Sequence, residues 1–349
     1  MSLTRTYLDH NATAPLRPEA RAAMLDALDV VGNPSSVHAE GRKARAIVEE
    51  ARERVADLVG VAPSQVVFTS GATESNCAVL RARWGAILVS GIEHDSVLAP
   101  ARASGCDVIE VATDASGAVR VDAIAAALEK ASERNGAPAL LAVQVANNET
   151  GVIQPVAAAA ALARERGGFV VHTDAVQAVG RIPLMFDELG VDTLSLSAHK
   201  LGGPKGVGAL ILKDDFDIAP LVMGGGQERR RRAGTENVIG IAGFGAAASA
   251  AKRDLADMAR LAELRDRLER EALELAPGAR VIGAEAPRLP NTTCLALPGM
   301  AAETLVIRFD LAGIAISAGA ACSSGKVGAS AVLAAMGLPD DLARSAIRV

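Results

Sequence analysis

Short aliphatic runs alternate with longer amphipathic stretches along the chain up to about residue 240. The short runs predict buried strands, and the longer stretches, whose apolar positions recur at helical spacing, predict helices. Strands are expected at residues 65–69, 86–90, 108–111, 140–145, 168–173, 193–196 and 207–212. Helices are expected at residues 36–60, 72–84, 121–134 and 155–166, with another between the strands at 86–90 and 108–111. This alternation predicts right-handed βαβ units and therefore an α/β fold with a mostly parallel sheet.

The pattern changes after about Gly240. A long helix is expected at residues 241–275, then strands near 279–282 and 292–297 and a helix at 301–311. This arrangement is typical of a second, smaller α+β domain. We expect residues 15–245 to form the large α/β domain, and residues 1–14 together with 246–349 to form the small one.

The composition indicates which residue types form the core and argues against nucleic acid and membranes as partners. Half of the 349 residues are hydrophobic but only 2% are aromatic, so the core must be built from Ala, Val, Leu and Ile. The net charge of −5 gives no general attraction for nucleic acid, and the basic run Arg229–Arg232 is too short to provide one locally. No apolar span of 18 residues predicts a membrane helix, and the polar N-terminus lacks a secretion signal. A cytoplasmic protein without membrane contact is expected.

The four cysteines, Cys77, Cys106, Cys294 and Cys322, are far apart and form no C-x-x-C pair. This spacing argues against a zinc site and a disulfide framework and favours a reducing compartment. Cys77 and Cys294 lie among apolar residues and are expected to be inert core thiols, whereas Cys106 is undecided. Cys322 lies in a loop of small residues, with Lys326 close enough to favour the thiolate, so we expect an exposed and reactive thiol.

Asp174 ends one predicted strand, and Lys200 follows the next one, just before a glycine-rich turn. Pyridoxal phosphate chemistry needs such a pair. The amine forms a Schiff base with the cofactor's aldehyde, and the carboxylate keeps the ring nitrogen protonated so that the ring can accept electrons. A strand-end aspartate and a solvated loop lysine would look the same, so the pair alone leaves that alternative open.

Further polar residues follow other predicted strands. The segment from Thr69 to Asn76 leads from a strand into a helix, where backbone amides and the Thr73 hydroxyl could bind an anion, although an ordinary helix N-cap is the alternative. His94 follows the strand at 86–90 and could stack on an aromatic ring or relay protons, or it could be a solvated loop residue. Asn148 follows the strand at 140–145 and could position a ligand, although such turns are common.

With these residues assembled, the chain resembles the cysteine desulfurases, a branch of the fold-type I pyridoxal phosphate enzymes. Similar blocks occur in family order from near the N-terminus to the last residues. They lie at residues 7–13, 32–38, 69–76, 93–94, 147–151, 172–177, 197–208, 224–237 and 347–348, together with the Cys322 loop. The block at 32–38 and the long cysteine loop are similar to the group that contains the nitrogen-fixation and iron–sulfur housekeeping enzymes.

The resemblance implies catalytic roles. Lys200 would bind the cofactor covalently, His94 would stack on its ring and take part in proton transfer, and Cys322 would attack the substrate sulfur. Arg348 would bind the substrate carboxylate, and Asn148 would contact both substrate and cofactor. No metal is required, although Cys322 could contact an iron–sulfur cluster transiently.

The resemblance also implies a cofactor site that draws on two subunits. The residues expected to contact pyridoxal phosphate are Ala72, Thr73, His94, Asn148, Asp174, Gln177, Ser197, His199 and Lys200, with Thr235 reaching in from the partner of a homodimer. Within this set, Asp174 would pair with the ring nitrogen, Gln177 and Asn148 would contact the ring oxygen, and the hydroxyl and imidazole groups would hold the phosphate.

The activity implied is conversion of L-cysteine to L-alanine, with the sulfur left as a persulfide on Cys322. That sulfur would pass to an acceptor such as an iron–sulfur scaffold protein, for cluster assembly or another delivery route. The alternatives are a selenocysteine lyase, another class V aminotransferase, or a sulfur-transfer scaffold without turnover. The family continues beyond Val349 with another strand and helix. We therefore expect a C-terminally shortened form in which Arg348 frays and cysteine is handled poorly.

Overall fold

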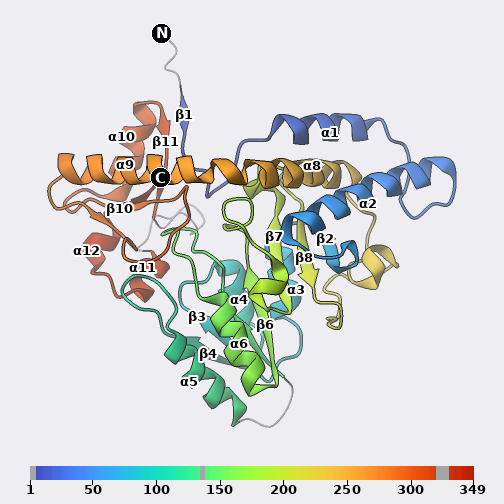
Figure 1. Ribbon diagram of the computed structural model, residues 1–349, viewed down its shortest axis with the longest axis horizontal. Helices are drawn as coiled ribbons and strands as arrows, with labels where there is room; N and C mark the ends of the chain where they lie inside the picture. Colours follow the sequence, from blue (N-terminus) through green and yellow to red (C-terminus); the bar gives the residue numbers. More distant parts are fainter. Residues whose placement is uncertain (1–4, 134–137, 320–329) are drawn as a thin grey trace.

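The computed structural model describes residues 5–133, 138–319 and 330–349, and its centre is a seven-stranded sheet of order β2-β8-β7-β6-β5-β3-β4 (Figure 1). The strands are β2 (Val66–Thr69), β3 (Ala86–Ser90), β4 (Asp107–Val111), β5 (Ala139–Ala142), β6 (Phe169–Asp174), β7 (Thr193–Ser197) and β8 (Gly208–Leu212). Only β8 runs antiparallel to its neighbours, β2 and β7, and the other pairings are parallel. The predicted mostly parallel sheet is confirmed.

Helices cover both faces of this sheet, which explains the nearly continuous aliphatic strands. The helices are α1 (Pro18–Leu28), α2 (Ala39–Val59), α3 (Ala72–Leu80), α4 (Asp95–Arg102), α5 (Val121–Ser132), α6 (Val156–Arg166), α7 (Phe186–Leu189) and α8 (Val238–Asp254). Ile87 and Val89 pack with apolar residues of α3 and α4, whereas Leu88 points to the opposite face and joins the core under α2, α5, α6 and α8. Successive residues of one strand thus serve two cores.

The expected long helix at 241–275 is interrupted. It consists of α8 and α9 (Met258–Leu275), joined by the 3-10 turn Leu255–Asp257. The two helices still follow one line across the top of the molecule in Figure 1, and they lead from the large sheet to the C-terminal elements. The backbone at the junction stays close to helical values, so a tighter turn replaces the α-helix there without redirecting the chain.

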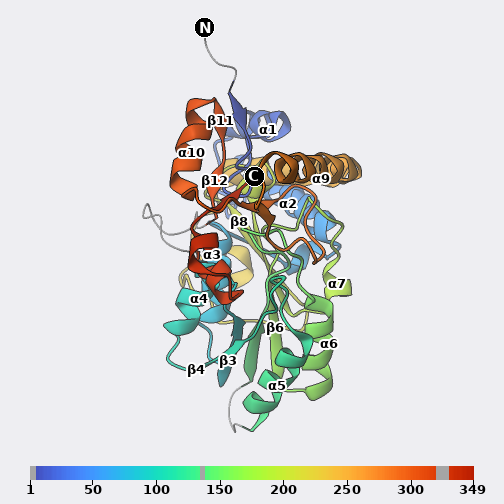
Figure 2. The same ribbon diagram turned by 90° about the vertical axis from the view of Figure 1, so that its left-hand side faces the viewer.

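The C-terminal part forms a separate four-stranded antiparallel sheet of order β12-β13-β10-β9. Its strands are β9 (Arg280–Val281), β10 (Cys294–Ala296), β12 (Ser317–Ala318) and β13 (Ala346–Arg348). A parallel pair, β1 (Thr6–Tyr7) and β11 (Ile314–Ala315), brings the N-terminal segment beside it (Figure 2). The helices of this part are α10 (Ala302–Leu311), α11 (Ala331–Ala335) and α12 (Asp340–Ala343). The N-terminal segment therefore lies where the predicted small domain places it, although the domain boundaries themselves stay a prediction.

None of the helices in the described ranges is both long and apolar enough to cross a membrane.

Candidate active site

The carboxyl ends of β2, β3, β5, β6 and β7 meet at one edge of the large sheet, because these strands run in the same direction. A cavity of about 620 Å³ opens there. Most of the site residues predicted from the sequence line it, namely Ala72, Thr73, His94, Asn148, Asp174, Gln177, Ser197, His199, Lys200 and Arg348. Residues that are far apart in the chain thus share one pocket.

Asp174 and Lys200 both line this pocket. Asp174 is the last residue of β6; its Oδ1 accepts a hydrogen bond of 3.0 Å from the backbone N–H of Val176. Lys200 ends a 3-10 turn directly after β7, and its Nζ donates to the carbonyl oxygen of Ala12 at 2.9 Å and also to that of Asn11. The N-terminal segment therefore closes one side of the pocket over the lysine.

His94 is the N-cap of α4 rather than a solvated loop residue. Its Nδ1 accepts a hydrogen bond of 3.0 Å from the backbone N–H of Ser96 and lies 2.8 Å from the Ser96 hydroxyl oxygen. These contacts fix the orientation of the ring on the pocket wall.

Donor groups gather at the end of the pocket where α3 begins. The first amides of a helix lack acceptors within the helix and attract anions, and here Ala72 and Thr73 occupy that turn. Gly208 on β8 allows the close approach, since a Cβ there would lie 2.6 Å from the Cα of Gly71. Burial, together with Lys200 and Lys205, lowers the pKa of the nearby His199 to about 4, so its ring is neutral.

Arg348 also lines the pocket and is 2% exposed. One terminal nitrogen donates to the carbonyl oxygen of Asn148 at 3.0 Å, and the other forms an ion pair of 2.7 Å with Asp9. Its Nε is buried without a hydrogen-bond partner among the residues that the structure describes. The expectation that Arg348 frays is wrong, because β13 is paired on both sides, with β12 and β10.

The sequence matches the class-V aminotransferase family over residues 6–346. It is 44% identical over 358 residues to the cysteine desulfurase of Cereibacter sphaeroides, an alignment that covers 99% of this chain and 90% of that protein. This chain belongs to the cysteine desulfurase family of class-V aminotransferases.

Solved structures agree with that assignment. The NifS-like protein from Rickettsia africae has a TM-score of 0.90 and 34% identity, covering 99% of this chain and 93% of that one. The structure described as SspA in complex with cysteine has a TM-score of 0.82 and 30% identity, covering 99% and 98%. The fold expected from the resemblance, that of the fold-type I enzymes, is therefore confirmed.

Two residues expected in a cysteine desulfurase site are not placed in this pocket. Cys322 lies outside the described residues. Thr235 is exposed and does not line the pocket of its own chain, so its assignment to a partner subunit stays a prediction. Of the thiols expected to be inert, Cys294 is buried, and burial raises its pKa to about 12, whereas Cys77 is only partly buried.

Several buried polar residues around the site were not predicted from the sequence as site residues. Asn76 donates to Asp174, and His172 lies behind Asn76. Glu93 is 3% exposed, and its Oε1 accepts a hydrogen bond of 2.8 Å from the backbone N–H of Gln144. The available signal was their position beside the predicted residues at the strand ends, but no spacing rule says which side chains meet.

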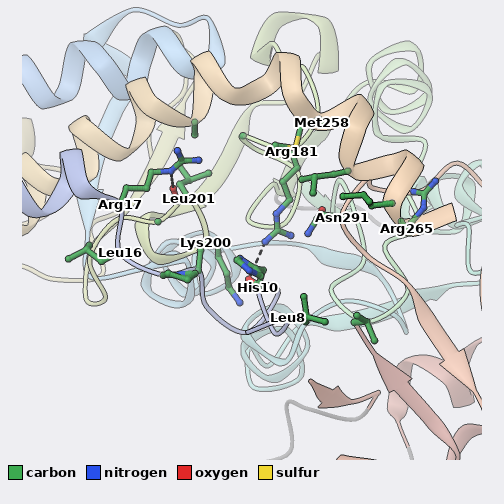
Figure 3. Close-up of a pocket in the computed structure, with 18 of the residues that line it drawn as sticks. Leu8, His10, Leu16, Arg17, Arg181, Lys200, Leu201, Met258, Arg265 and Asn291 are labelled. Atoms are coloured by element: carbon green, nitrogen blue, oxygen red, sulfur yellow. Dashed lines mark hydrogen bonds between the residues drawn. The ribbon is translucent and has the colours of Figure 1, made fainter. Parts of the chain in front are cut away.

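A second hollow, of about 600 Å³, lies on the other side of Lys200, between the N-terminal segment and α9 (Figure 3). Leucines of α9 and of residues 8–16 supply much of its wall, and Arg181 reaches across to the carbonyl oxygen of His10. It lacks Asp174, His94 and the start of α3, which line the first cavity, called the polar pocket from here on.

No group of three or more potential metal ligands occurs within residues 5–133, 138–319 and 330–349.

Proposed function

We propose that the polar pocket binds pyridoxal phosphate and removes sulfur from L-cysteine, giving L-alanine and a persulfide on Cys322. Cysteine desulfurases are generally pyridoxal phosphate enzymes. The observation that carries the proposal for this chain is the meeting of Lys200 and Asp174 in one cavity of about 620 Å³ with an anion-binding end.

The donor set fits this cofactor. A lysine amine is available for the aldehyde, a carboxylate for the ring nitrogen, and the start of α3 with Thr73 and Ser197 for the phosphate. When bound, the cofactor supplies a ring that accepts the electrons of the substrate's Cα–H bond. His94 is held by Ser96 on the pocket wall, where it can lie against that ring. Gln177 lines the same cavity, and we assign it to the ring oxygen.

The substrate end is assigned to Arg348. A guanidinium binds a carboxylate through two charge-assisted hydrogen bonds, and Arg348 lines this cavity. The neighbouring Asn148 contacts Arg348 through its carbonyl oxygen and lines the pocket, so it can contact the same substrate. A structural relative with bound cysteine supports cysteine as that amino acid.

The chemical steps then fall to four side chains. The Lys200 amine takes the proton from Cα, and Arg348 holds the carboxylate so that this bond is aligned. The Cys322 thiolate attacks the substrate sulfur, and an S–S bond forms as the Cβ–S bond breaks. The bond electrons stay with Cβ, which takes up a proton and becomes the methyl group of alanine, and Lys200 returns a proton to Cα. His94 stays close to the ring and shares in these proton transfers.

The outer sulfur of the Cys322 persulfide must then be transferred from the enzyme. A sulfur-acceptor protein, such as an iron–sulfur scaffold, is proposed as the partner, and a homodimer as the active unit. In that dimer Thr235, which is exposed in its own chain, would reach the neighbouring pocket.

Two covalent bonds test the proposal: the bond between the cofactor and Lys200, and the bond between the transferred sulfur and Cys322. Holoenzyme is reduced with borohydride and mapped by peptide mass spectrometry, and the cofactor label is expected on Lys200 and absent in Lys200→Ala. Enzyme incubated with L-cysteine should gain one sulfur atom on Cys322, and Cys322→Ala should bind cofactor but lose alanine formation. Label on another lysine, or near-parent alanine formation by Cys322→Ala, would refute the assignment.

A further inference from the structure

One buried amide stands behind the pocket wall and has no part in the reaction described above. Asn76 lies in α3 and is 0% exposed. Its Nδ2 lies 2.8 Å from Oδ2 of Asp174 and 2.9 Å from the hydroxyl oxygen of Ser96. Its Oδ1 lies 3.0 Å from Nε2 of His172, which is also 0% exposed. The amide thus uses both of its ends.

Hydrogen-bond chemistry fixes the direction of each bond on the inner side. An ionised carboxylate only accepts, so Asn76 must present its NH₂ group to Asp174 and its oxygen to His172. Nε2 of His172 therefore carries a proton. Burial lowers the pKa of His172 to about 4, so the ring is neutral and its Nδ1 is an acceptor. The hydroxyl of Thr193, 2.8 Å from Nδ1, donates to it.

The directions of the hydrogen bonds to Ser96 and His94, on the other wall of the pocket, follow in the same way. The second N–H of the Asn76 amide donates to the Ser96 oxygen, which leaves the Ser96 hydroxyl proton for Nδ1 of His94, 2.8 Å away. The backbone N–H of Ser96 donates to that nitrogen too. His94 therefore carries its ring proton on Nε2. One amide joins the two groups that face the cofactor.

We propose that Asn76 is a positioning residue for cofactor binding. It orients the Asp174 carboxylate and, through Ser96, the His94 ring, while His172 holds the amide from behind. The consequence for the cofactor rests on the proposed function, whereas the bond directions do not. Because a hydrogen bond to a charged group is lost, the affinity for pyridoxal phosphate should fall about 10- to 100-fold without the amide.

The first experiment measures cofactor affinity by absorbance titration of enzyme stripped of cofactor. Asn76→Leu, which is similar in size, and Asn76→Asp, which turns an acceptor toward Asp174, should both bind about 10- to 100-fold more weakly than the parent. Cys77→Ala, the next residue of the same helix, should bind like the parent. Melting curves of all variants establish that they are folded.

Asp174→Ala distinguishes a failure of the role of Asn76 from a failure of the proposed cofactor site. Weak binding by Asp174→Ala with parent-like binding by a folded Asn76→Leu would overturn the role of Asn76 alone. Parent-like binding by both would overturn the proposed cofactor site as well. Weak binding by both, with parent-like Cys77→Ala, supports the proposal.

A second experiment needs no variant that might unfold. ¹⁵N NMR of the unsubstituted protein labelled at histidine reports which ring nitrogen carries the proton. Both His172 and His94 should carry a proton on Nε2 and none on Nδ1. A proton on Nδ1 of His172 would mean that the Asn76 amide is reversed and that its oxygen faces Asp174, which would overturn the inference.

Discussion

Glu93 has no role in the proposed reaction, but it makes the stability of the fold depend on pH. It precedes His94 and is 3% exposed, and burial, reinforced by Asp174, raises its pKa to about 8. A carboxyl group whose pKa is higher in the folded than in the unfolded chain stabilises the fold least when both states are ionised. Its contribution is fully present below its ordinary value of 4.5 and is lost as the pH rises through about 8.

We therefore predict that Glu93→Gln removes this loss. The variant should differ little from the parent at about pH 5 and should be the more stable of the two at about pH 9, because its amide never ionises. Urea unfolding at both pH values measures the difference. Glu53→Gln, at an exposed position on α2, is the control and should show no such trend. A parent-to-variant difference that is the same at both pH values would contradict the assignment.

At the same scale, Arg348→Lys should impair substrate handling. Lysine cannot keep the contacts with Asp9 and Asn148 and also offer a fork to a carboxylate, so kcat/KM for L-cysteine should fall about tenfold or more. Steady-state alanine formation checks this, with Arg344→Lys at an exposed position as the control. Unchanged kinetics in Arg348→Lys would move the carboxylate site elsewhere.

At the scale of elements, a strained turn leads into the segment that carries Thr235. Three consecutive residues have positive φ: Glu228 at 44°, Arg229 at 56° and Arg230 at 69°. Glu228 is held there by two hydrogen bonds of 2.8 Å from the buried guanidinium of Arg52 and one of 2.8 Å from the backbone N–H of Phe68. The turn is therefore anchored to α2 and β2, and the left-handed backbone is the cost of that anchor.

Arg230→Gly should stabilise the protein by about 1 kcal/mol, because glycine adopts this backbone without the penalty that a Cβ imposes. Urea denaturation measures the gain. Arg230→Ala removes the same long side chain but keeps the Cβ, so it should bring no comparable gain. Equal stability of the two variants would show that the backbone at Arg230 is not strained.

The elements also show which features a sequence reveals. The strand Ala86–Ser90 was predicted with its observed bounds because it is an uninterrupted aliphatic run between two glycines. The strand Ala346–Arg348 was not predicted, because three residues are too few to show a period. The residues at the strand ends were predicted as site residues from the resemblance to the cysteine desulfurases, because the residues alone left ordinary loop and cap roles open. The role of Asn76 was not, because it depends on how α3 packs against β6.

At the scale of the whole molecule, several large apolar side chains remain strongly exposed in separate parts of the described chain. Val31 and Val37, in the connection between α1 and α2, are 81% and 87% exposed, and Met223 is 83% exposed. We expect the contact of the proposed homodimer to cover some of these apolar groups.

If the proposed dimer shares its sites between subunits, two inactive variants should complement each other. Lys200→Ala and Thr235→Val should each be poorly active alone, whereas mixed subunits should recover activity, because one site of each hybrid carries both changes and the other neither. Alanine formation after mixing and reassociation measures the recovery. No recovery in mixtures shown to contain hybrids would place Thr235 in its own subunit's site or outside any site.

The ion pair between Asp9 and Arg348 joins residues from the first and last parts of the chain. During synthesis, the large sheet can begin to fold while later residues are still being added. The part of the pocket formed by Arg348 cannot close until residue 348 has been made and β13 has entered between β12 and β10. Unfinished chains would thus be able to bring Asp174 and Lys200 together but would lack the proposed carboxylate site at Arg348. The order of translation itself then keeps incomplete protein from acting on cysteine.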